Sequence, residues 1–158
     1  MPGFFRKFPI FWAILFLCFT ANGFGQTYPL IDSIGLPDVG YSDLETADFN
    51  RDGFPDVFIS GKDGSQDQTG IYLNNGDSTF TPMGLGLLPV YDGSSAVADF
   101  NNDNWPDILY TGSYLNDSTT FQIYINNRDS TFQQLTTSVP GLNKGEITCA
   151  DFDSDGYT

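Results

Sequence analysis

The sequence predicts an all-β protein made of repeated units, and three features of the chain support this fold class. A pattern that begins Ala-Asp-Phe occurs three times, with its first aspartates at Asp48, Asp99 and Asp151, which lie 51 and 52 residues apart. Each complete copy is followed by short runs of β-branched and aromatic residues, separated by segments rich in Gly, Asn and Asp. No segment shows the sustained period of an amphipathic helix.

Each repeat contains the elements of four short strands in the same order. A lead-in strand precedes an acidic loop, a second strand follows the loop, a third follows a glycine-containing connection, and a last strand runs into a proline-containing loop. The first three strands are expected at residues 44–49, 56–60 and 71–75 in one repeat and at residues 96–100, 107–111 and 123–127 in the next. Four short antiparallel strands per tandem unit of about 50 residues are typical of a β-propeller blade.

The order of these units predicts how the chain is divided. We expect two complete blades at about 41–92 and 93–144 and the truncated start of a third at 145–158, which together form an incomplete propeller. A β-sandwich with two similar strand pairs is the alternative. It does not explain why both the acidic loop and the following hairpin recur in register.

The hairpin between the third and fourth strands carries the second recurring motif, Asn-Asn-x-Asp-Ser-Thr-Phe. In the first repeat Asn75 and Gly76 are expected to form a two-residue turn, because both tolerate positive φ angles. Arg128 replaces this glycine in the second repeat. Arginine adopts such angles less readily, so a looser turn is expected there.

The N-terminus has the pattern of a secretory signal peptide. Arg6 and Lys7 are followed by an apolar run at 8–20 and then by small residues, so we expect a signal peptide at 1–25. The apolar run is shorter than the ~20 residues that a membrane span needs, although an uncleaved anchor is an alternative. Residues 26–40 form a spacer or the first strand of a blade. The protein is therefore expected to be secreted or on the cell surface, with no stable membrane span after cleavage.

The composition excludes several classes of partner and chemistry. Lys and Arg number 6, Asp and Glu number 20, and the formal net charge is −14. Such acidity disfavours nucleic acids and anionic membrane surfaces as partners. The sequence contains no His, so neither Ser-His nor Cys-His catalysis is available from these residues.

The two cysteines do not form a disulfide framework. Cys18 falls in the predicted signal peptide, where lipid attachment is an alternative that the large residues before it disfavour. Cys149 lies in a strand-like pattern at 146–152, and we expect it to be a small buried core residue.

The acidic loop carries the strongest chemical signal. Oxygen-bearing side chains occupy its positions one, three, five and nine, a glycine at position six permits a sharp turn, and the carbonyl at position seven can complete an oxygen cage for Ca2+. The absence of Cys and His from the loops disfavours zinc and copper, and an all-protein cage suits magnesium poorly. The candidate ligands in the first loop are Asp48, Asn50, Asp52, the Phe54 carbonyl and Asp56.

The other two loops repeat this arrangement with small changes. Asn104 stands at position six of the second loop, where the first has Gly53. The candidate ligands in the second loop are Asp99, Asn101, Asp103, the Trp105 carbonyl and Asp107, and those in the third are Asp151, Asp153, Asp155 and the Tyr157 carbonyl. An EF-hand is disfavoured because position twelve holds no glutamate and a strand pattern follows. A metal-free turn held by side-chain hydrogen bonds is the remaining alternative.

The quoted motifs resemble a known repeat family. The segments ADFNRDGFPDVFISG and ADFNNDNWPDILYTG, with the hairpins IYLNNGDSTF and IYINNRDSTF, are similar to the FG-GAP/VCBS repeats of integrin-α-like β-propellers. The resemblance covers roughly residues 41–158. It implies a propeller, commonly of seven blades, with a calcium ion in the loop between two strands of a blade and the ligands listed above.

Two classes of function are compatible with these features. The first is a secreted or cell-surface module that binds a protein or glycan, as in adhesion, with calcium in a structural role. The alternative is the propeller part of a secreted carbohydrate-active enzyme such as a polysaccharide lyase, although no catalytic constellation stands out. Tyr91, Tyr110 and Tyr114 offer rings that can stack on sugars, but a packing role is expected for them.

Overall fold

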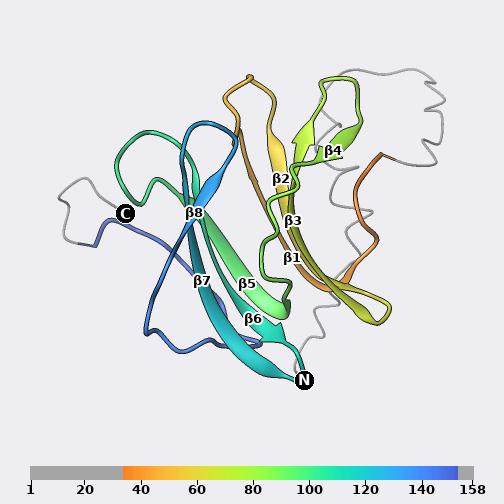
Figure 1. Cartoon of the computed structure of the whole chain (residues 1–158), viewed down its shortest axis with the longest axis vertical. Coiled ribbons are helices and arrows are strands. Elements are labelled where there is room, and N and C mark those ends of the chain that lie inside the picture. The colour runs from red at the N-terminus through yellow and green to blue at the C-terminus, as the bar shows by residue number, and fades with distance from the viewer. Residues whose placement is uncertain (1–33, 153–158) are drawn as a thin grey trace, which may run out of the picture. The chain divides into compact units, whose positions relative to one another are not determined.

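The computed structural model describes residues 34–152, which form eight strands and contain no helix (Figure 1). No helix in this part of the chain is long and apolar enough to cross a membrane. The predicted signal peptide at 1–25, most of the spacer and the last residues of the third repeat at 153–158 lie outside the described residues.

The strands form two four-stranded sheets in which each strand pairs antiparallel with the next along the chain. The first sheet contains β1 (Gly40–Ala47), β2 (Asp56–Asp63), β3 (Gln66–Asn74) and β4 (Phe80–Pro82). The second contains β5 (Tyr91–Ala98), β6 (Asp107–Tyr114), β7 (Ser118–Asn126) and β8 (Phe132–Leu135). The predicted all-β fold with four antiparallel strands in each complete repeat is confirmed.

The middle strands are longer than the sequence predicted. The connection expected at 61–69 is mostly paired backbone, because β2 and β3 stay in register out to Asp63 and Gln66. Only Gly64 and the serine after it remain for the turn, and Gly64 takes a φ of 56°, which suits a tight hairpin. Polar residues thus extend these strands because a short turn lets their backbone groups pair.

The hairpin before β4 differs from the predicted two-residue turn. Asn74 pairs with Phe80, so five residues form the loop, and the Asn75 amide donates to the Thr79 carbonyl at 3.0 Å. The turn closes through side chains, because the Thr79 amide donates to the Asp77 carboxylate at 3.0 Å. Positive φ angles occur at Gly76 and at the serine two residues later.

The second hairpin has the same geometry, so the expected loosening at Arg128 is wrong. Arg128 takes a φ of 69°, close to the 75° of Gly76. The Asn127 amide donates to the Thr131 carbonyl at 3.0 Å, as in the first hairpin. The Arg128 amide also donates to the side chain of Asn126 at 2.9 Å, which helps to hold arginine in this conformation.

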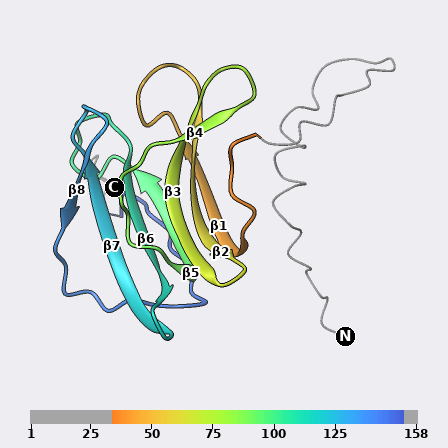
Figure 2. The ribbon, with the colours of Figure 1, turned by 45° about the vertical axis from the view of Figure 1, so that its right-hand side comes forward.

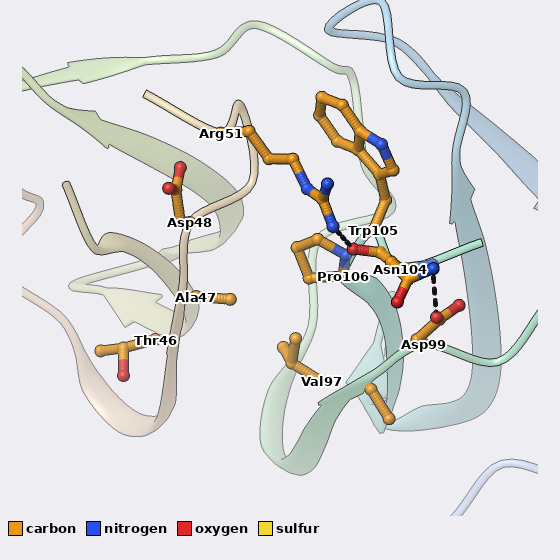
Figure 3. A pocket seen from close by; sticks show the side chains of 10 residues that line it. Thr46, Ala47, Asp48, Arg51, Val97, Asp99, Asn104, Trp105 and Pro106 are labelled. Carbon is orange, nitrogen blue, oxygen red and sulfur yellow. Dashed lines mark hydrogen bonds between the residues drawn. The ribbon is translucent and has the colours of Figure 1, made fainter. Parts of the chain in front are cut away.

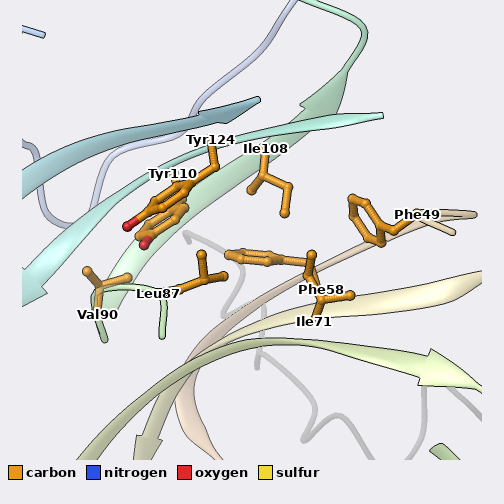
Figure 4. Packing of buried hydrophobic residues seen from close by; sticks show 8 residues of the cluster. All are labelled: Phe49, Phe58, Ile71, Leu87, Val90, Ile108, Tyr110 and Tyr124. Carbon is orange, nitrogen blue, oxygen red and sulfur yellow. The ribbon is translucent and has the colours of Figure 1, made fainter. Parts of the chain in front are cut away.

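The two sheets face each other (Figure 2), and the hydrophobic core lies between them (Figure 4). Phe58 of β2 packs on Tyr110 of β6 with ring centroids 5.4 Å apart, and Tyr110 stacks on Tyr124 of β7 at 5.8 Å. Leu87 and Val90, from the segment that joins the blades, are buried in the same cluster. One layer of aromatic and aliphatic side chains therefore fixes how β1–β4 and β5–β8 face each other.

Polar contacts also link successive repeats along the segments that precede their acidic loops. The Asp43 carboxylate of β1 accepts hydrogen bonds from the Ser95 amide at 2.6 Å and the Ser95 hydroxyl at 2.8 Å. One repeat later, the Ser94 hydroxyl accepts a hydrogen bond from the Ile147 amide at 3.1 Å. The same connection therefore joins the second repeat to the start of the third.

The predicted strand at 146–152 does not form. In the first two repeats this segment pairs with the strand after the acidic loop, whereas none of the eight strands of residues 34–152 pairs with it in the third. Cys149 is consequently half-buried and free, rather than a core residue. Burial and the nearby Glu45 carboxylate raise the pKa of its thiol.

Candidate metal sites in the acidic loops

Each acidic loop connects the first two strands of its blade, and the two loops share one backbone conformation. At position six, Gly53 has a φ of 91° and Asn104 a φ of 66°. The sequence predicted this left-handed position and the tolerance of asparagine for it. A second left-handed residue stands at position four, where both Arg51 and Asn102 have a φ of 57°, and no sequence signal predicted it.

Side-chain oxygens of the first loop accept hydrogen bonds from the loop's own backbone. The two carboxylate oxygens of Asp48 accept from the Asp52 amide at 3.1 Å and the Gly53 amide at 2.9 Å. Asn50 accepts from the Asp52 amide at 3.0 Å, and Asp52 accepts from the Phe54 amide at 2.8 Å. These bonds curl the backbone around the side chains at positions one, three and five.

The second loop repeats these contacts residue for residue. The Asp103 amide donates to Asp99 at 2.9 Å and to Asn101 at 3.0 Å. The Asn104 amide donates to Asp99 at 2.5 Å, and the Trp105 amide donates to Asp103 at 2.8 Å. Because position six differs between the loops, the shared conformation comes from the Asp and Asn side chains rather than from glycine.

The aspartate at position nine is fully buried and ties the loop to its blade. Asp56 accepts from the Phe49 amide at 2.9 Å and from the Asn74 amide at 2.8 Å. Asp107 accepts from the corresponding amides, those of Phe100 at 2.9 Å and Asn126 at 2.8 Å. This anchoring role was not predicted, although the Asn-Asn pair that recurs in both hairpins is a sequence signal for it.

The electrostatics of the loops follow from this placement. Burial raises the pKa of Asp56 above its ordinary value of 3.8, and the nearby Asp52 and Asp48 carboxylates add to the shift. Asp107 has a raised pKa for the same reasons. Desolvation opposes the ionisation of Asp103, but hydrogen bonds from Trp105 and Asn101 and the guanidinium of Arg128 hold its pKa below the ordinary value.

The donor set suits a hard cation in kind and spacing. Every side-chain candidate is a carboxylate or amide, and an oxygen that accepts one N–H retains a further lone pair. Within residues 34–152, no three acidic, His or Cys side chains lie close enough together, as arranged, to hold a metal ion. The curled backbone is in place, so holding an ion requires the side chains at positions one to nine to move closer together around one point.

The third loop is described only at its start. Asp151 lies within the described residues, whereas Asp153, Asp155 and Tyr157 lie outside them. The four predicted ligands of this loop therefore remain predictions.

An open groove of about 450 Å³ lies between the first and second loops, where the two blades meet (Figure 3). Asp48 and Asp99 lie on its opposite sides. The guanidinium of Arg51 lies 4.9 Å from the ring centroid of Trp105 and donates a hydrogen bond to the Asn104 carbonyl. The groove thus combines acidic, basic and aromatic groups from both repeats.

Comparison with known protein families agrees with this repeat structure. The model of the FG-GAP-like repeat family matches residues 48–110 and 99–158. The chain belongs to the FG-GAP-like repeat family. Both matched segments begin at the first aspartate of an acidic loop, so each FG-GAP-like unit of this chain starts with a candidate metal site. Searches of curated proteins and of solved structures returned no match.

The three tyrosines considered for sugar stacking take part in packing within the FG-GAP-like blades. Tyr110 is fully buried, and its hydroxyl donates to the Leu88 carbonyl at 3.1 Å. Tyr114 packs against the core cluster. Tyr91 is half-buried, with the ammonium of Lys62 lying 4.2 Å from its ring centroid. Tyr110 is thus inaccessible to a sugar, and Lys62 lies against the ring of Tyr91.

Proposed function

We propose that this FG-GAP-like repeat chain is a calcium-dependent recognition module, secreted or held at the cell surface, that binds an extracellular protein or glycan. The observation that carries this proposal is the recurrence of one loop conformation. Two loops of different sequence at positions four, six and seven place the same oxygen-bearing residues in the same hydrogen-bonded arrangement.

Calcium has a structural role in this proposal. The first loop would hold the ion through Asp48, Asn50, Asp52, the Phe54 carbonyl and Asp56, and the second through Asp99, Asn101, Asp103, the Trp105 carbonyl and Asp107. A bound divalent cation neutralises most of the charge of three clustered carboxylates. Because Asp56 and Asp107 also accept amides from neighbouring strands, stiffening the loop stabilises the blade.

The groove between the loops is the surface that we assign to recognition. It is polar, it lies where loops of two blades meet, and Arg51 and Trp105 on its wall are residue types that contribute strongly to binding sites. Calcium in the flanking loops would fix the walls of this groove. Ligand binding is therefore expected to require calcium.

Titration calorimetry of the intact protein tests the calcium proposal. We expect heat of calcium uptake, and we expect Asp48→Asn to remove one site because it takes a carboxylate from position one. Asp63→Asn is the matched control, since Asp63 is an exposed acid at the end of β2, outside both loops. Equal calcium uptake by the wild type and Asp48→Asn would contradict the assignment.

Recognition and localisation are tested separately. A glycan array probed in calcium and in chelator should give signals only in calcium, and Trp105→Ala should weaken them.

Secretion predicts that the mature protein begins after residue 25, which N-terminal sequencing of the extracellular fraction checks. Retention of residues 1–25 in that fraction would contradict the predicted cleavage.

A further inference from the structure

The two hairpins that flank the acidic loops differ at one left-handed position. Gly76 occupies it in the first repeat with a φ of 75°, and Arg128 occupies it in the second with a φ of 69°. Glycine is the usual residue for this conformation, and a long side chain there is uncommon. An uncommon residue at such a position suggests that its side chain has a role.

The side chain of Arg128 reaches the second acidic loop. Its Nε donates to Oδ2 of Asp103 at 3.0 Å, and the two groups form an ion pair. Asp103 stands at position five of the loop, and its side chain is only 10% exposed. A guanidinium therefore occupies one face of a carboxylate that is also a candidate calcium ligand.

The first loop has no counterpart to this contact. A Cβ at Gly76 would lie 2.8 Å from a carbon of the Phe54 ring. The aromatic residue at position seven of the first loop therefore occupies the space that a side chain at residue 76 would need. Within residues 34–152, no lysine or arginine forms an ion pair with Asp48, Asp52 or Asp56.

The guanidinium of Arg51, in the first loop, contacts the second loop. Arg51, at position four, donates to the Asn104 carbonyl and lies over the Trp105 ring. Two guanidinium groups therefore converge on the second loop, although the two loops carry the same number of aspartates. Within residues 34–152, the aspartates of the first loop are therefore left without an ion pair, whereas Asp103 of the second loop has one.

We propose that Arg128 is an internal counter-ion of the second loop, which competes with calcium for Asp103 and makes this loop the weaker of the two calcium sites. The inference rests on the proposed calcium function. The first loop depends on the metal for neutralisation, whereas the second is partly neutralised by its own chain. Calcium therefore fills the first loop at a lower concentration than the second.

Terbium luminescence of the intact protein carrying Asp48→Asn tests the proposal, because this change removes the first site and leaves the second loop beside the Trp105 indole. Terbium prefers oxygen ligands as calcium does, and its emission is sensitised by a nearby indole. Trp105 lies in the second loop, while position seven is Phe54 in the first loop and Tyr157 in the third. The other tryptophan, Trp12, lies in the predicted signal peptide. Tryptophan-selective excitation followed by displacement with calcium gives the calcium affinity of this loop.

Arg128→Gly, which restores the first-repeat residue, should strengthen terbium and calcium binding at the second loop by about two- to fivefold, the range expected for a partly exposed ion pair. Arg128→Asn should do the same without adding the flexibility of glycine. Arg128→Lys keeps the charge and should stay near the wild type. Lys144→Gln removes a charge that pairs with Asp92, away from the loops, and should change nothing.

Calorimetry on Asp48→Asn and Asp99→Asn gives the order of the two sites. The variant that keeps the first loop should bind calcium more tightly than the variant that keeps the second. If the sensitised emission gives the same calcium affinity for Arg128→Gly as for the protein with Arg128, the role of Arg128 is overturned and the calcium function stays intact. The absence of both sensitised emission and heat of calcium uptake would overturn the calcium function and this inference with it.

Discussion

At the residue scale, the buried carboxylates at position nine join the loop chemistry to the fold. Asp56 receives one amide from the acidic loop and one from the end of β3, and Asp107 does the same in the second blade. A hydrogen bond to a charged acceptor contributes more than one to a neutral acceptor. Each aspartate thus stabilises its blade even when no cation is present.

Replacing Asp56 with alanine is expected to lower the free energy of unfolding by about 2–4 kcal/mol, because two buried amides lose their acceptor. Urea denaturation in chelator measures this effect without a contribution from calcium. Asp63→Asn is the control, and it should change stability by less than about 0.5 kcal/mol. Similar losses in both variants would show that the anchoring role is wrong.

The raised pKa values of Asp56 and Asp107 predict the direction of the pH dependence. In chelator, the folded state holds protons more tightly than the unfolded chain between the ordinary value of 3.8 and the raised pKa. The free energy of unfolding therefore falls as pH rises through this window. Above the window, the full destabilisation from ionising the buried carboxylates is present. We expect the melting temperature in chelator to increase on mild acidification.

In calcium the dependence on pH should reverse, because protons and the ion compete for the same carboxylates. Thermal melts across the mildly acidic range, with and without calcium, check both directions. Parallel profiles in the two conditions would contradict the placement of calcium at these aspartates.

At the scale of the elements, the acidic loop and the hairpin depend on left-handed residues that side chains stabilise. Four residues of the two loops adopt this conformation, and only Gly53 among them is a glycine. The Asn and Asp side chains supply the hydrogen bonds that make it accessible to the others.

Gly53→Ala should destabilise the protein by about 1–2 kcal/mol, because alanine pays the full cost of the left-handed conformation. A Cβ at Gly53 meets no atom within 4 Å, so the cost is conformational rather than steric. Gly53→Asn is the matched variant, since Asn104 adopts the same conformation at the equivalent position. This variant should lose markedly less free energy of unfolding than Gly53→Ala. Equilibrium unfolding compares the two. An alanine variant as stable as the asparagine variant would refute this explanation.

The elements also show where sequence reasoning succeeds and where it stops. Runs of β-branched residues predicted the strands. Glycine in one loop and asparagine in the other predicted the left-handed conformation at position six. The five-residue hairpin did not, because its closure depends on the Asp77 side chain rather than on the Asn-Gly pair. The segment at 146–152 has a strand pattern, but a strand forms only when a partner strand is present.

At the scale of the whole molecule, the blades are held by contacts that no single repeat can make. Phe49, the residue after the first aspartate of the loop, is fully buried and meets Phe132 of the second blade with ring centroids 6.2 Å apart. Its carbonyl accepts a hydrogen bond from the Asn126 side chain at 3.0 Å. Because these contacts join residues far apart in the sequence, the motif predicted the candidate ligands but not the inter-blade role of Phe49 or the ion pair of Arg128.

Phe49→Ala should lower the free energy of unfolding by about 3–5 kcal/mol, as for large-to-small changes in a core. Phe54→Ala in the same loop is the matched control, because Phe54 is 46% exposed, and its loss should be much smaller. Chemical denaturation followed by circular dichroism measures both. Equal effects would contradict the packing of Phe49 between the blades.

The claim on which the account depends most is that calcium in the acidic loops stabilises the propeller. The most direct measurement is the melting temperature of the intact protein in calcium and in chelator, for the wild type and for a variant with both Asp48→Asn and Asp99→Asn. We predict a clear rise in calcium for the wild type and a much smaller rise for the double variant. Equal melting temperatures of the wild type in the two conditions would contradict the account.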